Sequence, residues 1–300
     1  MPDTDTVLTL RDIESWSFAG TALAVLGHPI HHSLSPAMHN AALAAMARTD
    51  ARFASWRYFR FDIHPDELPV ALDRLYAKKF RGINLTLPHK VLAFDRVAEI
   101  DEAARPVGAV NTLLWTERGW RGHNTDGHGL VAALRDDLDR KLVGASVVLL
   151  GAGGAARGAA VECLQRRCAS LWIANRTPDR LAALLGALAP FARGIPLRGF
   201  SSGAPPDDLP AGAIVINATS AGLHAGDPLP IDLRTLPRPA CVFDMIYNPP
   251  RTPLLRAADA LGVPAANGLS MLVHQGAQAL EIWTGAAVPV SAMRAALPAF

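Results

Sequence analysis

The sequence predicts an α/β protein with two domains, and three observations support this prediction. The chain has 300 residues, which is enough to bury two medium-sized cores. Short apolar runs alternate with helical patterns, which is typical of parallel sheets covered by helices. In the second half a glycine-rich turn, residues 151–158, joins an apolar run to a helical pattern. We therefore expect an N-terminal α/β domain followed by a doubly wound parallel sheet.

The first half contains the elements expected for the first domain. Several segments have the apolar, β-branched and aromatic content of strands: residues 21–27, 53–63, 82–87 and the hairpin 109–115 with 120–122. Others have helical spacing: residues 35–46, residues 66–79 and the segment that Pro88 opens. Ser35 and Pro36 predict the start of the first helix, with a hydroxyl at the N-cap and proline at the first helical position.

The second half repeats the order of strand and helix. The expected strands are residues 146–150, 171–175, 214–217 and 242–246. The expected helices are the segment from Asp126 to about residue 140 and residues 155–166, 178–188 and 253–261. A last helical pattern, residues 269–283, either closes this domain or returns to the first one.

Composition argues against several classes of partner. The formal net charge is +2 and the basic residues are scattered, so we expect neither nucleic acid nor a membrane surface. No apolar run reaches the roughly 18 residues of a membrane span. Residues 1–14 lack the basic start and apolar run of a secretory signal. The three cysteines are typical of small buried apolar residues, and we expect a reduced, cytoplasmic location.

Four histidines near the N-terminus raise the question of a metal site. They are His28, His31, His32 and His39. No cysteine joins them, and they do not have the spacing of known zinc motifs. We therefore expect no metal.

The glycine-rich turn predicts a dinucleotide site, since glycines after a strand let the backbone approach a pyrophosphate at a helix N-terminus. The next strand ends in Asn175, Arg176 and Thr177, with Arg180 one turn further on, where an NAD site carries an acidic residue. Two arginines suit the 2′-phosphate of NADP, and the two bonds would favour NADP by about 3–6 kcal/mol if fully formed. The alternative is a pair of solvated surface arginines.

Lys90 and Asp126 are the candidates for proton transfer. The 29 basic residues include only four lysines, and Lys90 follows a strand end that also carries Asn84 and Thr86. Asp126 stands before a helical pattern, where it also suits a helix N-cap, and Lys90 also suits a solvated helix position. Polar residues at further strand ends, Asn111 and Thr112 among them, favour a ligand site. Ser33 and Ser35 suit a substrate carboxylate at a helix N-terminus, while Tyr247 suits either a core or a ligand pocket.

Together these motifs resemble the shikimate dehydrogenase family, from about residue 23 to about residue 285. The matching pieces are GHPI of residues 27–30, SxSP of 33–36, NxTxPxK of 84–90, AVNT of 109–112, NTDG of 124–127, the glycine turn 151–158, NRTxxR of 175–180, NATS of 217–220, DMIY of 244–247, and Gly268 with Met271 and Gln275. Departures are a leader of about 20 residues, His123 before NTDG, and Ser270 where glycine is frequent.

The resemblance implies an enzyme that uses NADPH to reduce 3-dehydroshikimate to shikimate, on the way to chorismate and the aromatic amino acids. It implies that Lys90 and Asp126 are the catalytic pair. It implies substrate contacts from Ser33, Ser35, Thr86, Lys90, Asn111, Asp126, Tyr247 and Gln275. It implies NADP contacts from Gly151, Ala152, Gly153, Gly154, Ala155, Asn175, Arg176, Thr177, Arg180, Thr219, Met245, Gly268 and Met271.

The resemblance also implies that one domain binds the substrate and the other binds NADP. A substrate-binding domain of residues 1–125 would be completed by C-terminal helices in residues 268–300, and residues 126–267 would form a Rossmann-type NADP domain. Two alternatives remain open: a quinate/shikimate dehydrogenase of relaxed specificity, and a non-catalytic regulator that binds NADP or shikimate. A monomer and a homodimer both fit.

Overall fold

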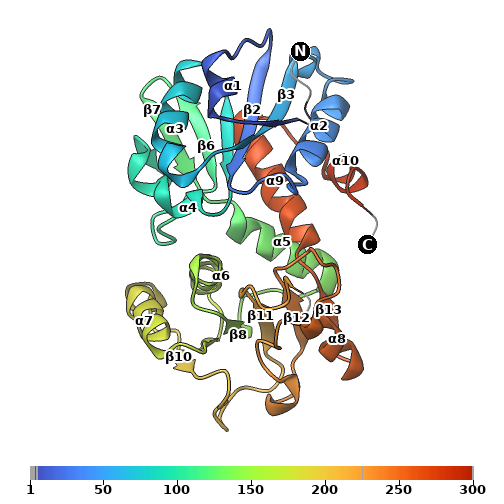
Figure 1. The fold of residues 1–300 in the computed structure, drawn as a ribbon. Coiled ribbons are helices and arrows are strands. Elements are labelled where there is room, and N and C mark those ends of the chain that lie inside the picture. The colour runs from blue at the N-terminus through green and yellow to red at the C-terminus, as the bar shows by residue number, and fades with distance from the viewer. Residues whose placement is uncertain (1–3, 5, 225, 299–300) are drawn as a thin grey trace. The chain divides into compact units, whose positions relative to one another are not determined.

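The computed structural model describes residues 4, 6–224 and 226–298, and it divides into two units (Figure 1). The first unit is formed by the chain up to Thr125 together with the segment from Gln275 onward. The second unit runs from Asp126 to His274. The chain therefore returns to the first unit at residue 275, within the last long helix, whereas the sequence-based boundary was residue 268.

A mixed sheet of seven strands forms the first unit, in the order β1-β3-β2-β4-β6-β7-β5. Its strands are β1 (Val7–Leu8), β2 (Thr21–Gly27), β3 (Trp56–Asp62), β4 (Gly82–Leu85), β5 (Glu99–Ile100), β6 (Thr112–Thr116) and β7 (Gly119–His123). All neighbours are parallel except β6, which is antiparallel to β4 and to β7. The carboxyl ends of β2 and β4 therefore lie at one edge of the sheet, where the polar motifs follow.

Helices cover this sheet. They are α1 (Leu10–Glu14), α2 (Ser35–Met46), α3 (Leu68–Ala77), the one-turn α4 (His89–Leu92), the second part of α9 (Leu269–Thr284) and α10 (Val290–Ala295). Ile13 of α1 and the leucines of α3 share an apolar core with Phe59, Phe61 and Phe80. Helix α2 contacts β2 and β3, and α10 packs on α2. Figure 1 shows α1 and α3 on one side of the sheet and α2 on the other.

The leader before the first matched strand belongs to this unit. Strand β1 pairs in parallel with β3 at the sheet edge, and Ile13 of α1 is fully buried. Thr9 and Asp12 form a capping box at the start of α1. Residues 7–14 therefore extend the sheet and cover part of its core.

Trp283 of α9 packs on the sheet of the first unit. Its side chain is 1% exposed, and its Nε1 donates to the carbonyl of Leu113 at 2.9 Å. Its own carbonyl accepts from Arg81 Nε at 3.0 Å. Gly82 makes room for the indole, because a Cβ at that position would lie 2.2 Å from Trp283 Nε1. A residue near the C-terminus is therefore part of the core of the N-terminal sheet.

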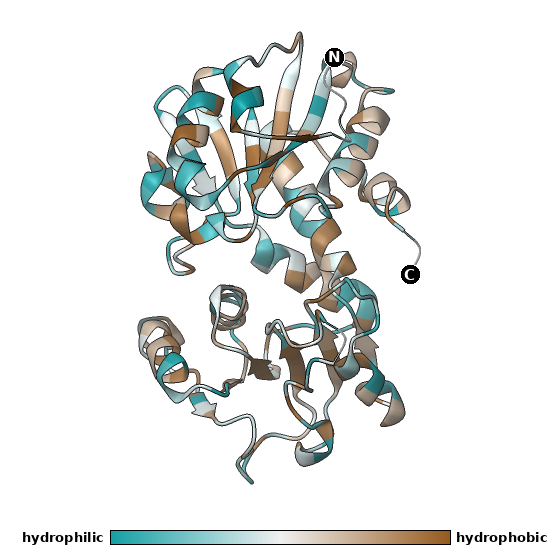
Figure 2. Ribbon diagram, in the orientation of Figure 1, coloured by the Kyte–Doolittle hydropathy of each residue, from teal (hydrophilic) through white to brown (hydrophobic). Residues whose placement is uncertain are grey.

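The second unit is a parallel sheet of six strands in the order β10-β9-β8-β11-β12-β13. The strands are β8 (Ser146–Leu150), β9 (Ser170–Ala174), β10 (Leu197–Phe200), β11 (Ile214–Asn217), β12 (Cys241–Asp244) and β13 (Ala265–Ala266). The helices are α5 (Asp126–Leu138), α6 (Gly154–Gln165), α7 (Pro178–Ala192), α8 (Pro253–Ala260) and the start of α9. Figure 2 shows the central strands as the hydrophobic part of the unit. This strand order is that of a doubly wound dinucleotide-binding sheet, with its switch point between β8 and β11.

The α/β class with a doubly wound second sheet is confirmed, and local details differ from the prediction. Ser35 is not the N-cap of α2: Leu34 already has helical backbone angles, φ −82° and ψ −6°, so Ser35 lies inside the first turn. Strand β3 begins at Trp56, since a 3₁₀ turn occupies Ala51–Phe53. The short strands β1, β5, β10 and β13 were not predicted. Among the described residues, no helix is both long and apolar enough to cross a bilayer, and no three potential ligand side chains gather around a metal position.

Candidate active site

Lys90 lies in the one-turn helix α4, which hydrogen bonds fix in place. Thr86 follows β4, and its amide donates to the Leu26 carbonyl at 2.9 Å. His89 is fully buried, its Nε2 lies 2.9 Å from the Ile63 carbonyl, and burial lowers its pKa. The Lys90 carbonyl accepts from the Val110 amide at 2.9 Å. The half-buried Lys90 is therefore joined through its backbone to the AVNT segment.

The two serines of the SxSP motif lie side by side at the start of α2. The Ser35 amide donates to Ser33 Oγ at 3.3 Å, and Ser35 is 7% exposed. Arg60 of β3 donates from Nη1 to the carbonyls of His31 at 2.8 Å and Ser33 at 3.4 Å. The loop before α2 therefore combines two hydroxyls with a guanidinium, which suits an anionic ligand.

Asn111 is the centre of a buried hydrogen-bond network in the first unit. Its Oδ1 accepts from the Thr125 amide and from the Thr112 hydroxyl, both at 2.9 Å. Its Nδ2 donates to the Thr125 hydroxyl at 3.0 Å and to Gln275 Oε1 at 3.4 Å. Asn84 Nδ2 donates to the Asn111 carbonyl at 3.1 Å and to the Thr112 hydroxyl at 3.0 Å. The structure thus brings Asn111 and Gln275 together and adds Thr125, which the sequence did not single out.

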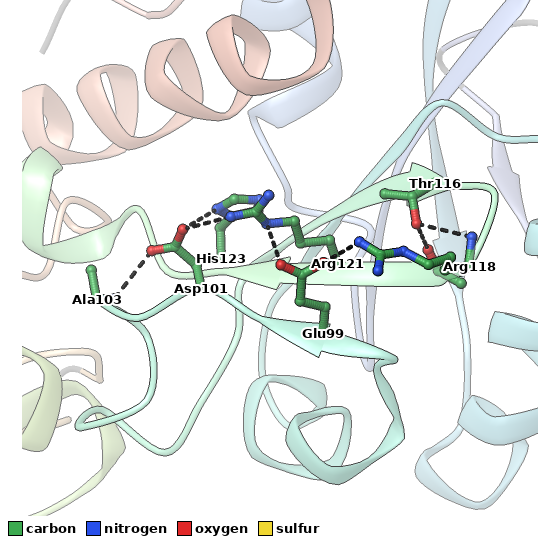
Figure 3. Close-up of polar contacts among 8 residues, drawn as sticks. Glu99, Asp101, Ala103, Thr116, Arg118, Arg121 and His123 are labelled. Carbon is green, nitrogen blue, oxygen red and sulfur yellow. Dashed lines mark hydrogen bonds and ion pairs between the residues drawn. The ribbon is translucent and has the colours of Figure 1, made fainter.

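A group of charged side chains anchors the strand that leads into Asn124 (Figure 3). Arg121 and His123 of β7 approach Asp101, with Arg121 Nη2 at 3.4 Å and His123 Nδ1 at 3.6 Å from Asp101 Oδ2. Glu99 of β5 lies 3.7 Å from Arg121 Nε and 3.6 Å from Arg118 Nη2. Burial lowers the pKa of His123. These contacts fix the end of β7 just before the NTDG motif.

His39 of α2 is fully buried, with its ring stacked on that of Tyr58 at a centroid distance of 4.2 Å. Burial lowers its pKa from 6.5 to about 3, so the folded chain holds it neutral. The contribution of neutral His39 to the free energy of unfolding is complete above pH 6.5, the pKa in the unfolded chain. It is lost as the pH falls toward about 3, the pKa in the folded chain. We expect the free energy of unfolding of His39→Leu to fall less steeply with acid than that of the wild type, by about 1.4 kcal/mol per pH unit.

Urea unfolding at several values between about pH 6 and pH 4 measures this difference. The variant His32→Leu serves as a control, because His32 is exposed. Equal slopes for the wild type and His39→Leu would show that His39 does not cause the acid sensitivity.

The glycine turn of the second unit lies at the switch point of its sheet. Gly151 follows β8 with φ +110°, and its amide donates to the Ala174 carbonyl at 2.8 Å. A Cβ at Gly151 would lie 3.0 Å from the Thr219 methyl group, so these two predicted residues are neighbours. Beside Gly153 and Gly154, by contrast, a Cβ would meet no atom within 4 Å. The N-terminus of α6, with Ala152 and Ala155, therefore borders open space in which its amides can face a pyrophosphate.

Asn217 and Asp244 hold the two loops that carry Thr219 and Met245. Asn217 Oδ1 accepts from the Thr219 amide at 3.0 Å, and its Nδ2 donates to Asp244 Oδ1 at 2.9 Å. Asp244 is fully buried and also accepts from the Thr252 hydroxyl at 2.6 Å, while burial raises its pKa. The sequence signal for this pair is a polar residue at the end of each of two apolar strands, but only the parallel pairing of β11 and β12 brings the two together.

The remaining predicted cofactor residues lie along β9, α7 and α9. Asn175 follows β9 and donates from Nδ2 to the carbonyl of Thr177, which is the N-cap of α7. Arg176 and Arg180 are exposed, and within the described part of the chain neither is in an ion pair. Gly268 packs against the Met245 backbone, where a Cβ would lie 2.2 Å from the Met245 carbonyl oxygen. Because β9 pairs with β8, the strand before the glycine turn, the two exposed guanidiniums after β9 fit a cofactor phosphate.

Three more of the predicted site residues, Asp126, Tyr247 and Met271, belong to the second unit. Asp126 is the first residue of α5, and Met271 is buried in α9. Tyr247 is half-buried, and burial raises its pKa. Ser270, which departs from the family pattern, donates to Asp137 Oδ1 at 2.8 Å and so joins α9 to α5.

The doubly wound sheet with a glycine turn at its switch point is the architecture of a dinucleotide-binding domain, and the relatives of this chain identify it as an NADP-dependent oxidoreductase. It is 45% identical to the shikimate dehydrogenase (NADP(+)) of Methanothrix thermoacetophila over 276 residues, which cover 92% of this chain and 96% of that protein. The chain belongs to the shikimate dehydrogenase family.

Family models and solved structures agree with this assignment. The model described as the shikimate dehydrogenase substrate binding domain matches residues 25–113, and that of the shikimate 5′-dehydrogenase C-terminal domain matches residues 268–297. Shikimate 5-dehydrogenase from Thermus thermophilus, in complex with NADP(H) and shikimate, has 35% identity and a TM-score of 0.79 over 92% of this chain and 98% of that one. Quinate dehydrogenase from Corynebacterium glutamicum, in complex with NAD, has 30% identity and a TM-score of 0.80 over 92% and 98%.

Proposed function

We propose that this protein is a shikimate dehydrogenase that reduces 3-dehydroshikimate to shikimate with NADPH, reversibly, in the biosynthesis of chorismate and the aromatic amino acids. The observation that carries the proposal is the similarity to NADP⁺-dependent shikimate dehydrogenases over 92% of the chain. The exposed Arg176 and Arg180 support the choice of NADP, because an NAD site has an acidic residue at this strand end.

The roles proposed for Lys90 and Asp126 follow from the charge that develops on the substrate during the reaction. When bound, NADPH supplies a hydride to the carbonyl carbon, so the carbonyl oxygen becomes negative and needs a proton. Lys90 gives this proton, and Asp126 orients the Lys90 ammonium and a substrate hydroxyl. This assignment makes Lys90 and Asp126 the catalytic residues.

Other groups bind parts of the substrate that do not react. Ser33 and Ser35 donate to the substrate carboxylate, assisted by Tyr247, and Arg60 adds positive charge to the same loop. The ring hydroxyls are held by Thr86, Asn111 and Gln275. Of these, Asn111 and Gln275 share the network described above.

A spectrophotometric assay of the purified protein tests the proposal. NADP⁺ with shikimate should give a rapid rise in NADPH absorbance, and quinate or NAD⁺ should give far slower changes. Comparable rates with NAD⁺ and quinate would instead favour a quinate/shikimate dehydrogenase of relaxed specificity. The relatives of this chain speak against that alternative, because they are NADP⁺-dependent shikimate dehydrogenases. Ligand binding without any absorbance change would favour a non-catalytic regulator.

Arg176 and Arg180 should determine the cofactor preference. We expect the double variant Arg176→Ala/Arg180→Ala to raise the KM for NADP⁺ by about 10- to 100-fold, since each guanidinium is exposed and its bond to phosphate is weakened by water. The KM for NAD⁺ should stay within about twofold, because NAD⁺ lacks the 2′-phosphate. Arg193→Asn at the far end of α7 is the control. An unchanged KM for NADP⁺ in the double variant would refute this role.

The location and assembly of the enzyme are further parts of the proposal. The cysteines Cys163, Cys168 and Cys241 are buried free thiols, which supports a reduced, cytoplasmic location. A monomer or a homodimer with a small-molecule substrate is proposed, with neither nucleic acid nor a membrane as partner.

A further inference from the structure

Thr125 is the residue at which the chain leaves the first unit, and Gln275 is the residue at which it returns. Their side chains meet, because Thr125 Oγ1 lies 3.4 Å from Gln275 Oε1. Thr125 is only 2% exposed, so its hydroxyl faces other protein groups. Asp126 is the next residue in the chain. Thr125 is therefore a neighbour in space of one proposed substrate residue and a neighbour in sequence of another.

The Thr125 amide fixes the direction of the surrounding hydrogen bonds. A backbone N–H can only donate, so the Asn111 atom 2.9 Å from it must be the side-chain oxygen. The other end of the Asn111 amide is then the NH₂ group, which donates to the Thr125 hydroxyl at 3.0 Å and to Gln275 at 3.4 Å. The Gln275 atom that faces Asn111 must consequently be its oxygen. The Gln275 NH₂ group therefore points away from Asn111.

The main chain of Asn111 is held by hydrogen bonds as well. Its main-chain carbonyl accepts from Asn84 Nδ2 at 3.1 Å and from the Leu85 amide at 2.9 Å. Asn84 is in turn held by the Tyr58 hydroxyl, which donates to its Oδ1 at 2.8 Å. All of these groups are buried or nearly so, and buried polar networks with fixed directions are rigid.

We propose that Thr125 is a positioning residue for substrate binding, whose amide and hydroxyl orient Asn111 and Gln275 so that Gln275 offers an N–H donor to a hydroxyl oxygen of the substrate. This inference rests on the proposed function. Thr125 does not touch the substrate in this role, and it acts through Gln275. The hydroxyl is the part that a substitution can remove, because the amide is present in every variant.

The variants Thr125→Val and Thr125→Ser separate the hydroxyl from the shape of the side chain. Valine has nearly the same shape and lacks the hydroxyl, whereas serine keeps the hydroxyl. We expect Thr125→Val to raise the KM for shikimate by about 3- to 10-fold, the value of one net hydrogen bond. The KM for NADP⁺ should stay within about twofold, and Thr125→Ser should restore the KM for shikimate. Thr284→Val is the matched control, because among the described residues the Thr284 hydroxyl bonds only backbone groups, those of Leu280 and Ala286.

A double-mutant cycle with Gln275→Ala tests whether Thr125 acts through Gln275. The effect of Thr125→Val on the KM for shikimate should fall below about twofold when Gln275 is already alanine. An undiminished effect in that background would overturn the proposal, as would a Thr125→Ser variant as impaired as Thr125→Val. If valine prevents folding, Thr125→Ala takes its place in the cycle.

The wild-type assay separates the two levels of the argument. A wild-type protein that fails to oxidise shikimate with NADP⁺ refutes the proposed function and this inference together. An active wild type with a normal KM for shikimate in Thr125→Val refutes only the role of Thr125.

Discussion

Replacement of Lys90 by alanine is expected to lower kcat for shikimate oxidation by about 10²–10⁴, which is the usual contribution of a positioned acid or base. In the proposed mechanism the Lys90 amine accepts the hydroxyl proton as hydride leaves for NADP⁺ in the direction of oxidation, and alanine offers no group that can do so. The loss corresponds to about 3–5 kcal/mol of transition-state stabilisation. The KM for NADP⁺ should change by less than about threefold, because the glycine turn and the arginines are untouched. Steady-state kinetics with both substrates varied measures the two constants.

Lys141→Ala is the control for this experiment. Lys141 is exposed and lies in the connection between α5 and β8, so its loss changes the net charge equally without affecting the proposed chemistry. If Lys90→Ala keeps a kcat near that of Lys141→Ala, Lys90 has no part in proton transfer, and another group must serve.

Of the substitutions proposed for this protein, Trp283→Ala is expected to lower the free energy of unfolding most. The indole is 1% exposed, fills the space above Gly82 and donates to the Leu113 carbonyl. Removal of a buried tryptophan leaves a cavity and costs about 3–5 kcal/mol. The Leu113 carbonyl also loses a hydrogen-bond partner. Urea unfolding should show this loss, and hydrogen exchange should locate it in the first unit, whose sheet Trp283 covers.

Trp56→Ala is the comparison for Trp283→Ala. Trp56 is a half-buried tryptophan at the start of β3, so its removal should cost distinctly less. Faster exchange confined to the amides of residues 126–274 in Trp283→Ala would contradict the assignment of Trp283 to the first core.

The sequence predicts the parts of the fold that local pattern determines. Strands β2, β8 and β11 have the predicted bounds, because each is a short apolar run between clear turn signals. The doubly wound order also follows from alternation and from the glycine turn after β8. The shikimate dehydrogenase family and NADP as cofactor are confirmed by the comparisons.

The parts that the sequence misses depend on tertiary contacts. Strands such as β1 and β13 have two residues each, too few for a pattern of their own, and they exist because a neighbouring strand pairs with them. The link between Thr125 and Gln275 joins residues 150 positions apart, and no local signal relates them. The assignment of Ser35 as N-cap was wrong because the backbone angles of Leu34, and not the residue type at position 35, decide where the helix begins.

The placement of Trp283 has a consequence for synthesis on the ribosome. Leu113 and Trp283 are 170 residues apart, so at about 5–20 residues per second the nascent first sheet waits roughly 10–30 s for the side chain that covers it. During that interval the residues that form the second unit are all translated, while the apolar surface near Gly82 stays open to chaperones. The N-terminal half is therefore made first and completed last.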